Sequence, residues 1–216
     1  MKKIISGIVL FVLILTGILV FQVNEKMTQK ELYGEAAVFF QEEDYKKAIQ
    51  FLEDASEHQN LFSGSMKREI AYYQAESYLK LEEYEEAIKI YDEILKDRGK
   101  DSIAYMMKAY CLTCMEDYDQ ALLVYEEGYK KTKDSEFLYC LANLHLTRKE
   151  YDKVQQIIDD SRNAEEETAQ KLAFLEIVLY EKQLDYKTAY EKAVSYCEQY
   201  PEDAKGIKER EFLKSR

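Results

Sequence analysis

Apolar residues recur at three- and four-residue spacing from Gln29 to Tyr200, as at Tyr72, Ala75 and Leu79. Residues at this spacing share one face of an α-helix, whereas a half-buried strand needs alternation with a period of two. Sustained alternation of that kind is absent from this stretch of the sequence. The pattern therefore predicts amphipathic helices and an all-α fold.

A short motif of the form Tyr-x-x-Ala returns five times and divides the predicted helices into pairs. Its tyrosines are Tyr45, Tyr84, Tyr118, Tyr151 and Tyr186, and Val154 replaces the alanine of the fourth copy. Successive motif tyrosines are separated by 39, 34, 33 and 35 residues. A period in the thirties is typical of stacked helix pairs rather than of one folded core. Each motif is expected to lie where a first helix has ended and a second begins.

The helix pairs follow from the motif and from the apolar pattern. The predicted first and second helices are residues 29–42 with 45–57, 66–80 with 84–97, 101–114 with 118–131, 134–147 with 151–161, and 165–182 with 186–200. The resulting units are 29–57, 66–97, 101–131, 134–161 and 165–200, which form one array over 29–200. The 39-residue step places extra residues at His58–Ser65, where we expect a loop.

An uncharged and predominantly apolar run covers residues 4–23, between a short N-terminal tail at 1–3 and a predicted linker at 24–28. Twenty helical residues extend about 30 Å, the thickness of a bilayer's hydrocarbon core. We expect an uncleaved signal anchor, a single transmembrane helix, because no Ala-x-Ala-like site follows the run; a removed secretory peptide is the alternative. Lysines lie on both sides of the run, so charge gives little preference for either orientation. We expect the large C-terminal part on the extracytoplasmic side of the cytoplasmic membrane.

The units resemble tetratricopeptide repeats (TPRs) over about 170 residues. With the motif alanine at position 20, position 8 is small in four units and position 11 is large in most. These residues are Ala36, Ala75, Ala109 and Ala142 at position 8, and Phe39, Tyr78, Leu112, His145 and Tyr180 at position 11. The sequence departs from the family pattern in having no Trp, and in placing Ile177 at position 8 and Ser161 and Tyr196 where Ala is usual. The resemblance implies a right-handed superhelical solenoid of about five helix pairs, closed by a polar capping helix at 201–216.

The resemblance also implies a partner-binding groove, since first helices line the concave face of such arrays. An amphipathic helix needs one apolar stripe to fold, so a second stripe calls for another surface. The residues expected in this groove are Tyr33, Phe40, Tyr72, Glu76, Leu79, Met106, Tyr110, Tyr139, Asn143, Leu146, Phe174 and Val178. The alternative is that these side chains pack against neighbouring repeats or against the C-terminal helix.

Charge narrows the kind of partner. The chain has 42 acidic and 30 basic residues, a formal net charge of -12, which disfavours nucleic acid. Glu69, Glu76, Glu136 and Glu181 on the predicted groove favour a ligand that is apolar with basic flanks. Because Asn143 is not accompanied by suitably placed cations, the family's clamp for a peptide C-terminal carboxylate is not expected.

No catalytic motif is recognisable, and the cysteines are expected to be structural. Cys111 and Cys114 form a Cys-x-x-Cys spacing, and Cys140 and His145 lie on the next first helix. A zinc site of these four residues is conceivable by residue type, but buried cysteine as a small apolar side chain is the favoured interpretation. We therefore expect a non-enzymatic acidic protein without metal or cofactor. It would be a membrane-tethered scaffold or adaptor for protein–protein interaction, or alternatively a holdase-type chaperone; the sequence leaves the partner and the oligomeric state open.

Overall fold

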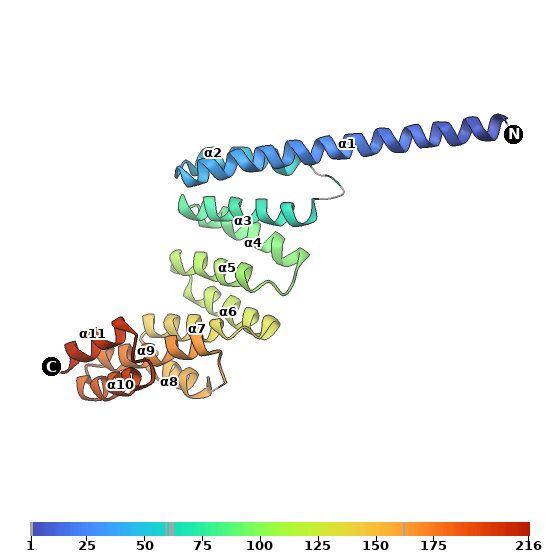
Figure 1. Cartoon of the computed structure of the whole chain (residues 1–216). Coiled ribbons are helices and arrows are strands. Elements are labelled where there is room, and N and C mark those ends of the chain that lie inside the picture. The colour runs from blue at the N-terminus through green and yellow to red at the C-terminus, as the bar shows by residue number, and fades with distance from the viewer. Residues whose placement is uncertain (1, 59, 61–62, 162) are drawn as a thin grey trace. The chain divides into compact units, whose positions relative to one another are not determined.

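The computed structural model describes residues 2–58, 60, 63–161 and 163–216, and side chains from residue 11 onward. Eleven helices and no strand occur among these residues (Figure 1). Contacts divide the chain into two compact units, Met1–Gly99 and Lys100–Arg216. The all-α fold of helix pairs predicted from the motif is confirmed.

Within the repeat array the helices begin and end within two residues of the predicted bounds, apart from the start of the first. Unit 1 contains α1 (Lys2–Gln41), α2 (Tyr45–Glu57), α3 (Gly64–Lys80) and α4 (Tyr84–Asp97). Unit 2 contains α5 (Ser102–Cys114), α6 (Tyr118–Thr132), α7 (Glu136–Thr147), α8 (Tyr151–Asp160), α9 (Glu166–Lys182), α10 (Tyr186–Gln199) and α11 (Ala204–Leu213). The last of these lies inside the segment expected to cap the array. The connection between α2 and α3 begins at His58 as expected, but Gly64 and Ser65 of the expected loop already belong to α3; residues 59, 61 and 62 lie outside the described ones.

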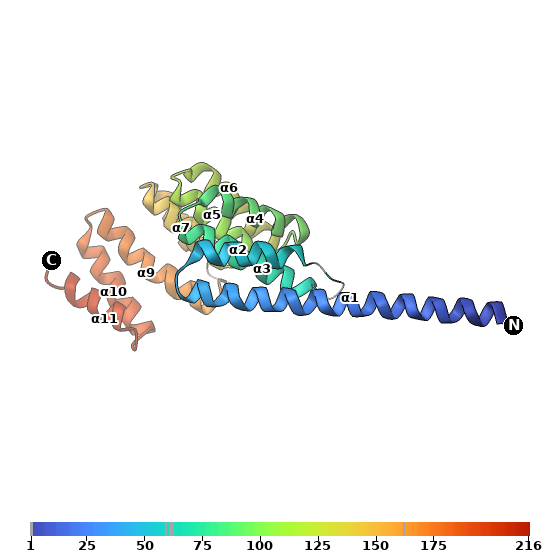
Figure 2. The ribbon, with the colours of Figure 1, turned by 90° about the horizontal axis from the view of Figure 1, so that it is seen from above.

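Helix α1 is continuous, and this corrects the expected linker at 24–28. Those residues are helical, so the apolar segment and the first repeat helix are one element of 40 residues (Figures 1 and 2). The sequence from residue 18 to residue 33 contains neither Gly nor Pro, the two residues that most weaken a helix. A change from apolar to polar composition does not by itself end a helix.

Polar contacts fix α1 against the loop that follows α2. Gln29 is 1% exposed; its Nε2 donates to the Ala55 carbonyl at 3.1 Å and its Oε1 accepts from Ser63 Oγ at 2.9 Å. One turn earlier, the Glu25 carboxylate lies 2.9 Å from His58 Nδ1. A buried amide needs such partners, so these contacts define where α1 packs against α2 and the residues that follow it.

The repeated motif forms the joint between paired helices. Two residues before each motif tyrosine the backbone is left-handed, with φ between 60° and 63°; these residues are Glu43, Glu82, Glu116, Lys149 and Leu184. The next residue is the N-cap of the second helix. Its side chain accepts from a backbone amide at Asp44, Asp117 and Asp185, but not at Glu83 or Glu150. Left-handed backbone followed by a cap reverses the chain and satisfies free amides.

Small side chains at the motif let the paired helices approach closely. The residue at position 20 is 0% exposed in all five repeats; these residues are Ala48, Ala87, Ala121, Val154 and Ala189. In unit 2 the cores continue through Leu172, Leu175 and Leu179, and through Tyr196, Cys197 and Leu213 under α11. The motif is therefore a packing feature, and the groove-facing residues must be sought on the first helices.

Candidate functional site

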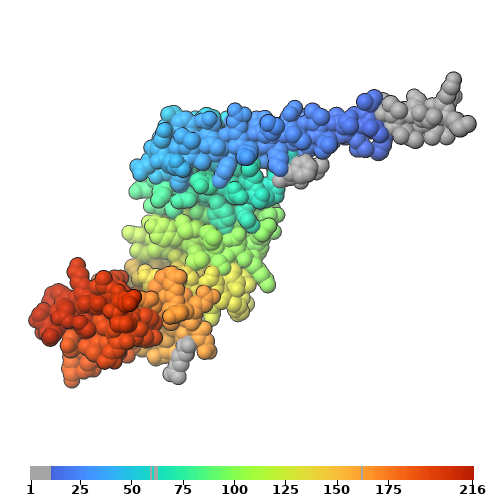
Figure 3. Space-filling model, in the orientation of Figure 1, coloured from blue at the N-terminus to red at the C-terminus, as the bar shows by residue number. Residues whose placement is uncertain are grey.

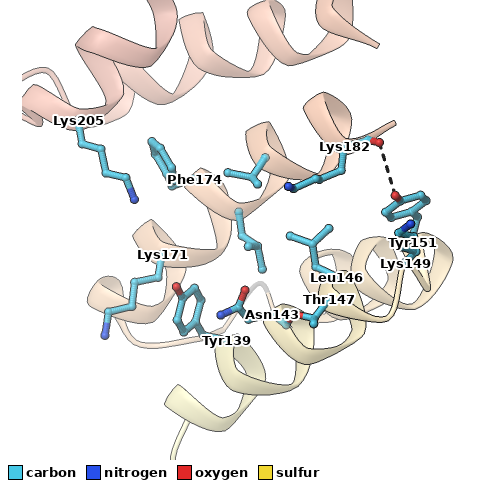
Figure 4. A pocket seen from close by; sticks show the side chains of 12 residues that line it. Tyr139, Asn143, Leu146, Thr147, Lys149, Tyr151, Lys171, Phe174, Lys182 and Lys205 are labelled. Carbon is cyan, nitrogen blue, oxygen red and sulfur yellow. Dashed lines mark hydrogen bonds between the residues drawn. The ribbon is translucent and has the colours of Figure 1, made fainter. Parts of the chain in front are cut away.

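A pocket of about 500 Å³ lies in unit 2 between α7, α9 and α11 (Figure 4). Its lining residues are Tyr139, Asn143, Leu146, Thr147, Lys149, Tyr151, Lys171, Phe174, Leu175, Val178, Lys182 and Lys205. Five of the twelve predicted groove residues are brought together here, namely Tyr139, Asn143, Leu146, Phe174 and Val178. They come from two successive first helices, as the repeat register predicts.

The apolar residues of the pocket differ in how much surface they offer. Leu146 and Leu175 are 8% and 5% exposed and belong to the core beneath the pocket. Tyr139 and Phe174 are half-buried, while Asn143 is exposed. The two alternatives weighed from the sequence therefore both occur: some predicted groove residues pack inward, and others remain accessible to a ligand.

Four lysines line the same pocket, and no carboxylate does. Lys171 pairs with Glu136 at 2.8 Å and with Glu167 at 3.0 Å, and these contacts raise the pKa of its ammonium group. Lys205 Nζ lies 3.9 Å from the centroid of the Phe174 ring. Among the described side chains, Lys149 and Lys182 form no ion pair. The pocket is therefore positively charged in an acidic protein.

Helix α11 places Lys205 beside the pocket, and Asp203 holds the start of this helix. One carboxylate oxygen accepts from the Lys205 backbone amide at 2.9 Å, and the other accepts from the Tyr196 hydroxyl. Gln170 Nε2 donates to the Tyr196 hydroxyl at 3.1 Å and to Asp203 at 3.3 Å. The Phe174 ring meets Tyr196 edge to face at 5.6 Å. The capping helix is thus part of the site.

Sequence reasoning missed the lysines of this pocket. Lys171 and Lys182 occupy positions 2 and 13 of the fifth repeat, which are groove positions in the resembling family. The prediction selected mainly aromatic and apolar residues at such positions and left these two lysines out. Lys149 belongs to an inter-helix turn and Lys205 to the capping helix, so the repeat register contains no signal for either. Their place in the pocket depends on how the turn after α7 and the helix α11 are positioned against α9.

In unit 1 two predicted groove residues, Tyr33 and Phe40, pack on the ring of Tyr73. Phe40 contacts both Tyr45 and Tyr73, with ring centroids 5.4 Å and 5.2 Å away, and Tyr33 meets Tyr73 at 5.6 Å. Burial, and next the neighbouring Tyr73, raise the pKa of Tyr33 to about 12. Tyr73, which the sequence did not single out, is thus the centre of this aromatic group.

The remaining predicted groove residues do not line the unit 2 pocket. Tyr72, Glu76 and Leu79 on α3 are partly buried, and Tyr72 lies 6.4 Å from the ring of Tyr91. On α5, Met106 is partly buried and Tyr110 is 48% exposed. Tyr110 is therefore the most accessible aromatic residue of the predicted set.

The four cysteines form no disulfide bond with one another. Burial raises the pKa of Cys111 to about 12 and that of Cys140 to about 11. His145 is engaged elsewhere, because its Nδ1 lies 2.6 Å from the Glu150 carboxylate. Within the described ranges no three His, Cys, Asp or Glu side chains gather as a metal site would require. The Cys-x-x-Cys spacing therefore lies on a helix without the arrangement that a metal needs.

The N-terminal helix presents apolar side chains that other described residues do not cover. From Phe11 to Val23 the large apolar residues are between 44% and 62% exposed. Figure 3 shows this segment of α1 extending beyond the other helices of unit 1. Among the described residues, α1 is long and apolar enough to cross a membrane by length and composition. The side chains of residues 4–10 of the expected anchor lie outside the described ones.

Comparison with known proteins identifies the repeats. Residues 19–94 and 59–128 match a family model described as anaphase-promoting complex, cyclosome, subunit 3. The two matches together cover about half of the chain. No curated protein matches the sequence. Among solved structures, a tetratricopeptide repeat protein from Parabacteroides merdae aligns with a TM-score of 0.66 at 16% identity, over 87% of this chain and 72% of that one.

Two further solved structures share the fold. MamA from Desulfovibrio magneticus RS-1 aligns with a TM-score of 0.58 at 20% identity, over 82% of this chain and 98% of that one. YrrB, described as a TPR protein with an unusual peptide-binding site, aligns with a TM-score of 0.55 at 14% identity, over 83% and 90%. The helix pairs, their joints and these matches agree, and the chain belongs to the tetratricopeptide repeat family.

Proposed function

We propose that this protein is a non-catalytic, membrane-tethered TPR adaptor that binds a protein partner or an extended peptide along its first helices. The observation that carries the proposal is the pocket between α7, α9 and α11. It combines accessible aromatic surface with polar groups, which is the usual composition of a binding site. Aromatic residues also dominate the energetics of many protein interfaces.

The family supports a role in binding rather than catalysis. YrrB, with the same fold, is described as having a peptide-binding site. Fold alone does not fix function, so the argument rests on the pocket residues themselves. Tyr139, Asn143 and Phe174 present a ring, an amide and a second ring from adjacent first helices. Such a strip suits an extended segment better than a small rigid ligand.

The tether is α1. Its exposed apolar side chains between Phe11 and Val23 cost free energy in water, at about 25 cal/mol per Å² of apolar surface. A bilayer would cover them, and the repeats would then be held at the membrane, where local concentration favours repeated capture of one partner. We place the repeats on the extracytoplasmic side of the cytoplasmic membrane. Protease added to cells with an opened outer envelope should digest residues 31–216; full protection would reverse this orientation.

Partner chemistry differs between the two units. In unit 1, Glu69 and Glu76 form no ion pair among the described residues, and Tyr33 lies close to Glu69. We therefore assign the preference for an apolar ligand with basic flanks to unit 1 alone. In unit 2, Glu136 already pairs with Lys171, so it offers little to a basic ligand. Phosphate-bearing nucleic acid remains disfavoured by the net charge of -12.

Site-specific photo-crosslinking in intact membranes tests the proposal. A photoreactive residue is placed at Asn143 in the pocket, and as a matched control at Gln156, an exposed position on α8 that does not line it. Capture of one protein from Asn143 and not from Gln156 is expected for an adaptor. Capture of many unfolded exported proteins would favour the holdase alternative. Equal capture from both positions, or none from Asn143, would refute binding at this pocket.

A further inference from the structure

The pocket of unit 2 has the opposite charge to the chain that contains it. The sequence carries a net charge of -12, yet Lys149, Lys171, Lys182 and Lys205 line the pocket without any carboxylate among the lining residues. Charged groups across an interface are arranged so that opposite signs meet. The sign of the pocket is therefore informative about its ligand.

The lysines lie at two ends of an apolar strip. In Figure 4, Lys171 and Lys205 lie at one end and Lys149 and Lys182 at the other, with the side chains of α7 and α9 between them. Tyr139, Leu146, Phe174 and Val178 form most of this strip, and Asn143 adds one exposed amide. The arrangement suits a ligand that is apolar in its centre and anionic on both sides.

The acidic groups near the pocket leave three of the four lysines available. Glu136 and Glu167 both pair with Lys171. Asp203 is occupied by the Tyr196 hydroxyl and by the backbone amide at the start of α11. Burial, and next the like charge of Glu209 on α11, raise the pKa of Glu181, whereas the positive charge of Lys182 lowers it. Among the described side chains, Lys149, Lys182 and Lys205 form no ion pair.

The spacing of the lysines sets the length of the ligand. Lys171 marks the end of the strip at which the available Lys205 also lies, and Lys182 marks the other end. Both Lys171 and Lys182 belong to α9, and at about 1.5 Å per residue their Cα atoms are about 16 Å apart along its axis. An extended peptide rises about 3.3 Å per residue, so about five residues separate the two ends. One or two apolar side chains fit between acidic residues at that separation.

We propose that the pocket between α7, α9 and α11 binds an extended segment of a partner protein in which acidic side chains about five positions apart flank an apolar residue. This inference rests on the proposed binding function and names the chemistry of the ligand in unit 2. The ligand is recognised through side chains inside the segment and not through a terminal carboxylate, because the cations stand at both ends of the strip. The lysines set specificity and association rate, and the strip supplies the apolar contact.

Labelled synthetic peptides test the charge preference on the full chain in detergent micelles, by fluorescence anisotropy. Three peptides with blocked ends carry a central Phe and differ only at two flanking positions, which are Glu, Gln or Lys. The Glu peptide is expected to bind more tightly than the Gln peptide, and the Lys peptide least tightly. A fourth peptide with Glu and a free C-terminus should bind no better than its blocked form. Tighter binding of the Lys peptide, or dependence on a free C-terminus, would overturn the proposal.

Paired variants connect this preference to the pocket. Lys182→Gln with Lys205→Gln removes one cation from each end of the strip. The affinity for the Glu peptide should fall roughly tenfold, because two partly screened charge contacts are lost. Lys187→Gln with Lys208→Gln is the matched control, because both residues are exposed and outside the pocket, and it should leave affinity unchanged. Equal weakening by both pairs, or none by the first, contradicts the assignment.

Crosslinking from Asn143 separates this inference from the proposed function. If the parent protein captures the partner and capture falls in the Lys182→Gln, Lys205→Gln variant, the proposed binding function and the acidic ligand are both supported. Undiminished capture in that variant overturns the acidic ligand while leaving the groove function intact. Capture of a second copy of this chain at Asn143 also overturns the assignment to a separate partner. No capture by the parent refutes the proposed function itself.

Discussion

Substitution of Gly128 by alanine should loosen the packing of α6 in unit 2. A Cβ atom at this position would lie 2.5 Å and 2.6 Å from two carbons of the Phe137 ring, and 2.9 Å from Tyr105 Cβ. Carbon atoms in contact are ordinarily about 3.5–4.0 Å apart, so the neighbours must move by about 1 Å. Phe137 is 0% exposed, so its ring cannot move aside into solvent without opening the core.

The expected cost follows from two opposing effects. Overpacking costs about 1–3 kcal/mol, and the three contacts below 3.0 Å put this case at about 2–3 kcal/mol. Replacing Gly by Ala inside a helix gains about 1 kcal/mol. A net loss of about 1–2 kcal/mol should raise the population of locally open states by roughly 5–30-fold. Hydrogen exchange followed by mass spectrometry would detect it as faster exchange in α6 and α7, with α3 as an internal reference.

Gly34→Ala is the matched control for this experiment. Gly34 is also inside a helix, but nothing lies within 4 Å of the added Cβ. Only the gain in helix propensity remains, so exchange in α1 should be slower or unchanged. Exchange in α6 and α7 that is no faster in Gly128→Ala than in the parent protein would refute the close packing of α5, α6 and α7.

Two further substitutions test the joints of the fold. Asp203→Ala should cost about 1 kcal/mol as a lost helix cap and speed exchange in α11. The Tyr196 hydroxyl bond, as the largest cause, lowers the pKa of Asp203. The carboxylate's contribution is therefore complete above its unfolded pKa of about 4 and is lost as pH falls through the lower folded pKa, so the parent and variant should converge in acid. Leu184→Gly should stabilise α9 and α10 by up to about 1 kcal/mol, since Leu184 has φ 63° and is 71% exposed; a lower thermal midpoint would contradict this.

The sequence predicted the repeats well because the signal is local. Each joint places a left-handed residue, a cap and a tyrosine in a fixed order, and the small residue that follows is fully buried. The order of these residues does not depend on distant parts of the chain. Helix bounds therefore followed from spacing alone.

The last repeats depart from the family pattern, and the structure contains compensating residues there. Tyr196 stands where Ala is usual, and it is 4% exposed. Gly206 makes room for its ring, because a Cβ at Gly206 would lie 2.4 Å from it. Gln170 and Asp203 bind its hydroxyl. Such compensation joins α9, α10 and α11, so no single-helix pattern could have indicated it.

The pocket of unit 2 was predicted only in part for the same reason. The repeat register placed Tyr139, Asn143 and Phe174 on one face correctly enough to meet in one pocket. It did not predict the pocket's charge, because Lys205 reaches the site from α11 and Lys149 from a turn. Charge at a site is a property of several elements, whereas a register describes one helix at a time.

The continuity of α1 has a geometric consequence for any partner held by unit 1. An α-helix turns about 100° and rises about 1.5 Å with each residue. Inserting one residue between positions 24 and 28 would therefore rotate the bound face of unit 1 by about 100° relative to the apolar segment, while moving it by only about 1.5 Å. A flexible tether would absorb such an insertion. Here the number of residues in one helix sets the direction in which the helix pairs of unit 1 face relative to the apolar segment.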